Sequence, residues 1–202
     1  MREPARDART RIQFFRQALA RMGVGAFIFP RGYFMDSISN LRLTDAAGAG
    51  TTTGGALKDR GNVVLKFDRY GNLLQKLGKD GVAGDRSEGL FTQPTAVITN
   101  ARSEIFIAEC HDGDIANRIS KFTPEGRFIK TIVTGGNALG QVRIPHCLAF
   151  DSKGRLFVCD RGNNRISIFD QDGHFLEAWK RFGRPSGRED TKMNFKHPKR
   201  LT

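Results

Sequence analysis

The chain has 202 residues, a hydrophobic fraction of 39% and a formal net charge of +12 at pH 7. Such a length suits one domain with a sizeable core, and no stretch approaches the roughly 20 consecutive apolar residues of a membrane span. Three cysteines without CxxC spacing exclude a zinc finger of the usual pattern and do not indicate a disulfide framework, so a reducing compartment is the simplest expectation.

The positive charge is concentrated at the two ends of the chain. Residues 1–23 are rich in arginine, and their apolar positions recur every three to four residues, which predicts an amphipathic helix or a basic tail. No secretory signal peptide is visible there, so we expect a cytoplasmic protein by default. Residues 188–202 form a second basic, polar tail. Such tails leave nucleic acid open as a partner.

Between the tails, residues 24–187 contain three copies of one unit. The first copy, 27–74, is the weakest and is interrupted by an insertion at 46–61. The second copy is 93–132 and the third is 144–179. A fourth copy begins at Phe182-Gly183-Arg184-Pro185-Ser186-Gly187, and there the pattern stops.

The third copy shows most clearly what each unit is. Short apolar or alternating runs at 144–150, 156–159, 165–169 and 175–179 are separated by turn residues such as Asp151-Ser152-Lys153-Gly154 and Asp172-Gly173. Alternation with period two predicts strands, and the turns make neighbouring strands antiparallel. The second copy repeats this frame, including Pro94 for Pro145 and Asn117-Arg118-Ile119 for Asn164-Arg165-Ile166.

A four-stranded unit that recurs every roughly 40–50 residues is typical of a β-propeller blade. The sequence therefore predicts an all-β fold: a partial β-propeller of about three four-stranded blades, with a short N-terminal helix. Many of the 16 phenylalanines fall at equivalent blade positions and should form the core between blades. An open stack would leave two blade faces in water, which predicts self-association.

The repeat resembles the NHL repeat in Val158-Cys159-Asp160, in Asn163 to Ile166 and in Phe169 to Phe175. Within that class, the order of motifs is similar to peptidyl-α-hydroxyglycine α-amidating lyases and their bacterial relatives. The residues that carry this likeness are Phe91-Thr92-Gln93-Pro94-Thr95, Ile144-Pro145-His146, Cys159-Asp160-Arg161 and the Phe182 to Gly187 run. The resemblance implies a central zinc held by three histidines, with a tyrosine and arginines acting on the hydroxyglycine.

Carried over residue by residue, the resemblance makes His146 a metal ligand and Arg161 a catalytic arginine. His111 lies in the loop that holds the family's tyrosine, and Arg31 replaces a histidine ligand. With one matching histidine, we expect no tightly bound catalytic zinc, although zinc remains the cofactor that the resemblance implies. Arg118 and Arg165 are repeat-equivalent, and we expect them to clamp loops through Glu109 and Asp160.

Two functions follow from these patterns. The first is an interaction module, a truncated relative of the lyases, whose propeller rim binds a protein, a peptide or a nucleic acid. The second is a zinc-dependent lyase-like enzyme, or its remnant, with Arg161, His111 and His146 in the site. The replacement of a ligand by Arg31 favours the interaction module.

Overall fold

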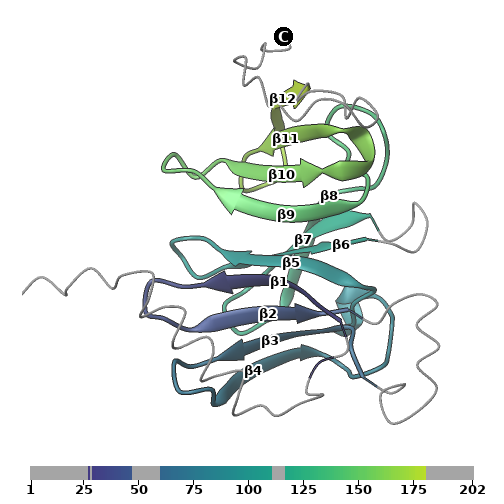
Figure 1. The fold of residues 1–202 in the computed structure, drawn as a ribbon. Helices are drawn as coiled ribbons and strands as arrows, with labels where there is room; N and C mark the ends of the chain where they lie inside the picture. The colour runs from purple at the N-terminus through teal and green to yellow at the C-terminus, as the bar shows by residue number, and fades with distance from the viewer. Residues whose placement is uncertain (1–26, 28, 47–59, 111–116, 181–202) are drawn as a thin grey trace, which may run out of the picture.

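The computed structural model describes residues 27, 29–46, 60–110 and 117–180 of the chain. They form three four-stranded antiparallel sheets, each with its strands in sequence order (Figure 1). The first sheet contains β1 (Pro30–Met35), β2 (Leu41–Asp45), β3 (Val63–Phe67) and β4 (Leu73–Gly78). The second contains β5 (Pro94–Thr99), β6 (Ile105–Glu109), β7 (Arg118–Phe122) and β8 (Phe128–Val133). The third contains β9 (Pro145–Phe150), β10 (Leu156–Asp160), β11 (Arg165–Phe169) and β12 (Phe175–Lys180).

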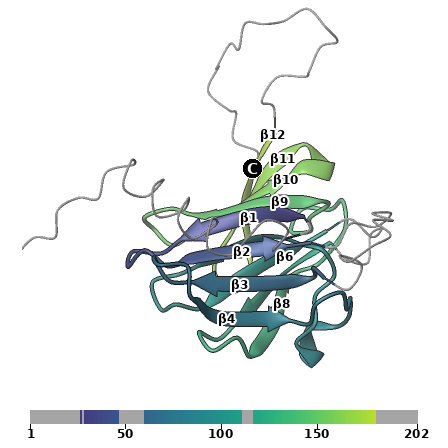
Figure 2. The same ribbon diagram turned by 60° about the horizontal axis from the view of Figure 1, so that its bottom comes forward.

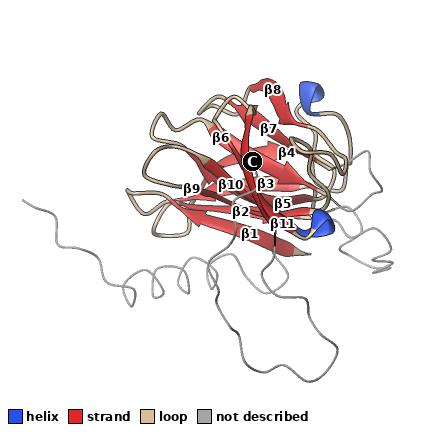
Figure 3. Cartoon of the chain, turned by 90° about the horizontal axis from the view of Figure 1, so that it is seen from above, coloured by secondary structure: helices blue, strands red, loops and turns tan. Residues whose placement is uncertain are grey.

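The three sheets are the three predicted blades, which confirms the all-β partial propeller. Strands β1, β5 and β9 are the inner strands, and β5 lies between the other two (Figure 1). Each blade extends outward from its inner strand, as β2, β3 and β4 follow β1 in Figure 2. Two short 3-10 segments, Arg86–Glu88 and Arg161–Asn163, are the helical pieces of the described residues (Figure 3). None of the described residues forms a helix long and apolar enough to span a membrane. The expected N-terminal helix, the basic C-terminal tail and most of the insertion lie outside the described residues.

Turn chemistry explains where the strands reverse. At the β3–β4 turn, Asp68 accepts the backbone N–H groups of Tyr70 and Asn72 at 2.8 and 2.9 Å on one carboxylate oxygen. Gly71, with φ +88°, occupies the left-handed position that the turn requires. In the third blade, Asp151 at the β9–β10 turn and Asp170 at the β11–β12 turn accept the same i+2 and i+4 amides. The Asp-x-x-Gly signals in the sequence thus set the hairpins.

The middle blade is packed on both of its faces. Side chains of β6 alternate, so that Ile105 and Ile107 belong to a core shared with the first blade, while Phe106 and Ala108 belong to a core shared with the third. Phe91 and Phe122 contact each other in the first of these cores, with ring centroids 5.6 Å apart. The prediction that phenylalanines form the core between blades is confirmed.

Buried ion pairs hold the loops at one end of the second and third blades. Arg118 Nε and Nη2 donate to the two carboxylate oxygens of Glu109 at 2.9 and 2.7 Å. Arg165 Nε donates to Asp160 at 2.6 Å, and its Nη2 donates to the carbonyls of Ala138 and Gln141. The predicted loop clamps are therefore confirmed. The first blade has Asp45 paired in register with Val63 and so has no arginine at this position.

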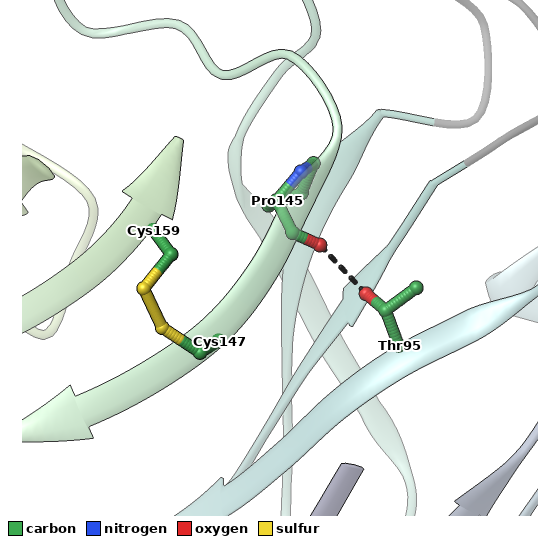
Figure 4. Close-up of a disulfide and its surroundings, with 4 residues drawn as sticks. All are labelled: Thr95, Pro145, Cys147 and Cys159. Atoms are coloured by element: carbon green, nitrogen blue, oxygen red, sulfur yellow. Dashed lines mark hydrogen bonds between the residues drawn. A yellow bond between two sulfur atoms is a disulfide. The ribbon is translucent and has the colours of Figure 1, made fainter. Parts of the chain in front are cut away.

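Cys147 on β9 and Cys159 on β10 form a disulfide, with their Cα atoms 5.0 Å apart (Figure 4). The cysteine count and spacing did not indicate this bridge. The count of cysteines is odd because Cys110, which is buried and free, belongs to the interior of the middle blade and not to a bridge. A disulfide also removes the argument for a reducing compartment, because such bonds persist in oxidising ones.

Candidate functional site

The first residues of the three inner strands are held together at one end of the propeller. Gly32 on β1 lies so close to β5 that a Cβ atom there would come within 2.5 Å of the Thr95 carbonyl oxygen. The Thr95 hydroxyl in turn donates to the carbonyl oxygen of Pro145 on β9 at 2.7 Å (Figure 4). The strand beginnings Pro30-Arg31, Pro94-Thr95 and Pro145-His146 are therefore equivalent positions around one centre.

Two arginines and one histidine gather at this end. Arg161, the first residue of a 3-10 segment after β10, has Nη1 3.4 Å from Nε2 of His146. The guanidinium carbon of Arg31 lies 4.2 Å from the ring centroid of Phe29, in a cation–π arrangement. We call Arg31, His146 and Arg161 the axial basic cluster. The structure thus brings the predicted residues His146 and Arg161 together, whereas His111 lies outside the described residues.

Cys110 lies in the interior beside this cluster. Burial raises the pKa of its thiol to about 11, although a hydrogen bond with the Thr95 side chain and the charges of Arg31 and Arg161 act to lower it. The thiol is therefore protonated at neutral pH and adds no negative charge to the cluster. The sequence marked Thr95 only as part of the Phe91 to Thr95 motif and gave neither Thr95 nor Cys110 a role in the site. Thr95 could have been found by aligning Pro94-Thr95 with Pro145-His146.

The residues of this end do not fit a catalytic zinc. Such a site takes three protein donors that converge on the ion, and no group of three His, Cys, Asp or Glu side chains is placed to do so within the described residues. The sulfurs of Cys147 and Cys159 are bonded to each other, and Cys110 is held in its thiol form. Permanent charges on Arg31 and Arg161 would repel a dication. We therefore derive no step through a metal.

Three inner strands around one centre, each the start of a four-stranded blade, define this protein as a β-propeller protein. Residues 143–169 match the NHL repeat family. The chain therefore carries an NHL repeat, as the sequence predicted.

Two curated relatives support this family. NHL repeat-containing protein 3 from Homo sapiens is 35% identical over 121 residues, which cover 59% of this chain and 35% of that protein. Peptidyl-glycine alpha-amidating monooxygenase from Mus musculus is 30% identical over 165 residues, covering 77% of this chain and 15% of that protein. Both matches therefore cover well under half of the relative's length.

The crystal structure of a nidogen/laminin complex contains a chain with a similar fold. The TM-score is 0.56 at 16% sequence identity, and the match covers 79% of this chain and 50% of that chain. An identity this low supports the shared propeller fold and no shared activity.

Proposed function

We propose that this chain is an interaction module whose loop-bearing end, around the axial basic cluster, binds a protein or peptide. NHL-repeat propellers generally mediate protein interactions, which supports this reading. The observation that carries it is the composition of the axial basic cluster. Arg31 stands at the strand position equivalent to His146, so the centre presents cationic hydrogen-bond donors in place of a set of metal ligands.

The charge distribution favours a protein or peptide over a nucleic acid. The described residues contain 19 Lys and Arg against 14 Asp and Glu, a net charge of +5 out of the +12 of the whole chain. Many of these charges are already paired, as in the network of Lys121 with Glu104 and Asp172. A binding surface for a nucleic-acid backbone requires an extended row of unpaired cations.

An array of synthetic peptides tests this function. We expect a subset of sequences to bind the wild-type protein at micromolar concentration and to lose binding when Arg161, at the mouth of the centre, is changed to Gln. Contacts to several phosphates weaken by orders of magnitude between about 0.05 and 0.2 M salt. Peptide binding that persists over this range would argue against a nucleic-acid ligand at the same site. The proposal fails if no peptide binds, or if an oligonucleotide binds more tightly than every peptide.

A lyase-like activity is the second candidate, and the similarity to the amidating monooxygenase over 77% of the chain is the observation in its favour. In that case His146 would be the metal ligand and Arg161 the catalytic arginine, with His111 from the neighbouring loop. Two measurements decide it: zinc content after dialysis, and release of glyoxylate from a peptidyl-α-hydroxyglycine. Stoichiometric zinc, together with a rate that collapses in His146→Ala, would replace the interaction module as the function.

A further inference from the structure

The two arginines of the axial basic cluster differ from the other arginines at this end of the propeller. Arg118 and Arg165 are each joined to a buried carboxylate. Among the described residues, Arg31 and Arg161 have no carboxylate within ion-pair distance. Nε of Arg31 is also buried without a hydrogen-bond partner. Nε of Arg42 is the other such donor among the described residues. A buried donor left unpaired costs about 1–3 kcal/mol, and more on a charged group, so each calls for a partner such as a water or an ion.

Neither guanidinium group is paired with a carboxylate, although Nη1 of Arg161 lies within hydrogen-bond distance of His146. Arg31 on β1 and His146 on β9 occupy equivalent strand positions, so both guanidinium groups belong to the end of the propeller where the inner strands begin. Both charges also act on the pKa of the Cys110 thiol. Nε2 of His146 lies beside Arg161 at 3.4 Å and adds a third polar group. The positive charges of two different blades therefore converge over the start of β5.

The carboxylates at the ends of β6 and β10 are already committed elsewhere. Glu109 accepts the amide of Thr92 at 2.7 Å as well as both bonds from Arg118. Asp160 accepts the amide of Arg143 at 2.7 Å and the Arg165 guanidinium. The Cys110 thiol is protonated. The described residues thus leave the centre with uncompensated positive charge, and an anion supplied from outside would both neutralise it and accept the unused N–H groups.

We propose that the axial basic cluster binds a single carboxylate of an acidic peptide between Arg31 and Arg161, beside His146. The guanidinium groups donate to the carboxylate oxygens, and Thr95 fixes the spacing of the first residues of β5 and β9 beneath it. This inference rests on the proposed function, because it names the group by which the interaction module holds its peptide. A compact centre with two cations suits one carboxylate, whether it is a side chain or a peptide C-terminus.

Three short peptides separate these possibilities. The first has blocked ends and one internal Glu, the second is the same peptide with Gln, and the third is neutral with a free C-terminal carboxylate. Isothermal titration with the full chain should give a dissociation constant at least tenfold lower for a carboxylate-bearing peptide than for the Gln peptide. The stronger of the first and third peptides identifies the source of the carboxylate.

Variants then place the bound group. Arg31→Gln and Arg161→Gln should each weaken carboxylate binding at least tenfold, whereas Arg31→Lys should keep part of it. Arg69→Gln is the matched control, because it removes the same charge at the β3–β4 turn, away from the inner strands, and should change nothing. Circular dichroism and thermal melting of each variant show that it is folded.

The results distinguish the carboxylate anchor, by which we mean carboxylate binding between Arg31 and Arg161, from the broader proposal of a peptide-binding module. If peptides of the array bind the wild-type protein but Arg31→Gln and Arg161→Gln bind them equally well, the carboxylate anchor is wrong and the module stands. Equal affinity for the Glu and Gln peptides would also overturn the anchor. If no peptide binds at all, both proposals fail.

Discussion

Removing Arg118 should destabilise the protein far more than removing an exposed arginine of the same blade. The Glu109 side chain is 0% exposed, and Arg118 supplies two of its hydrogen bonds, at 2.9 and 2.7 Å. Arg118→Met keeps the aliphatic bulk but leaves a buried carboxylate without its counter-ion, which typically costs about 3–5 kcal/mol. Arg102 pairs with Glu104 but is 71% exposed, so Arg102→Met should cost less than about 1 kcal/mol.

Urea unfolding followed by circular dichroism measures both variants against the wild type. A domain with a total stability of about 5–15 kcal/mol remains measurable after such a loss, and Arg118→Lys, which retains the charge, provides an intermediate point. The double variant Arg118→Met with Glu109→Gln should recover much of the loss, because the unpaired charge is then gone. If Arg118→Met and Arg102→Met differ by less than about 1 kcal/mol, the reasoning from burial is refuted.

Three further outcomes can be checked in the same way. Gly173→Ala should lower the melting temperature more than Gly89→Ala, because both have positive φ, of +93° and +75°, but only at Gly173 would a Cβ atom overlap a carbonyl of the neighbouring blade; equal shifts would contradict this packing. Thr95→Val should cost about 1–3 kcal/mol by leaving a buried carbonyl of β9 unpaired, and no loss would mean that the hydroxyl does not join the inner strands. The hydrogen bond from the Asn72 side chain, together with backbone amides, lowers the pKa of Asp68. The stability that this carboxylate contributes is therefore complete above the unfolded pKa of about 4 and is lost as the pH falls through the lower folded value. Asp68→Asn should make the urea midpoint less dependent on pH in this acid range, and an unchanged pH dependence would argue against the turn.

Much of the fold was predictable because the same local sequence signals specify the strands and turns of each blade. Alternation in Arg165 to Phe169 and the Asp-x-x-Gly turns specify strands and hairpins without any long-range information. The pairing of Arg118 with Glu109 followed from the equivalence of the blades. Burial in the middle blade was harder to foresee, since all of Ile105–Glu109 is buried and the charged end of the strand looks solvated in the sequence.

The site was less predictable because it depends on positions that only the packing of the inner strands brings together. The repeat places Arg31 and His146 at equivalent positions, but it does not show that the Arg161 guanidinium lies beside the His146 ring. Cys110 could not be recognised as part of this centre, because a lone cysteine after a strand has no motif. The disulfide was missed for a related reason: counting cysteines treats all of them as equals, whereas the fold buries one and pairs the other two.

The disulfide has a further meaning when the blades are compared position by position. Cys147 follows Pro145 by two residues, as Ala96 follows Pro94 in the middle blade, and Cys159 directly precedes Asp160, as Ala108 directly precedes Glu109. In the middle blade those alanines are buried against the third blade. On the third blade the equivalent places are an exposed and a half-buried position.

The third blade therefore has a disulfide at the positions where the middle blade has alanines packed against its neighbour. Closing a loop of this size contributes about 3 kcal/mol in the chain-entropy account, a gain comparable with burying one or two large apolar side chains. The disulfide joins β9 to β10 within the third blade, so this hairpin is stabilised whether or not another element packs on the outer face of the blade. Reduction should therefore loosen the third blade first and leave intact the core around Phe91, which the first and middle blades share.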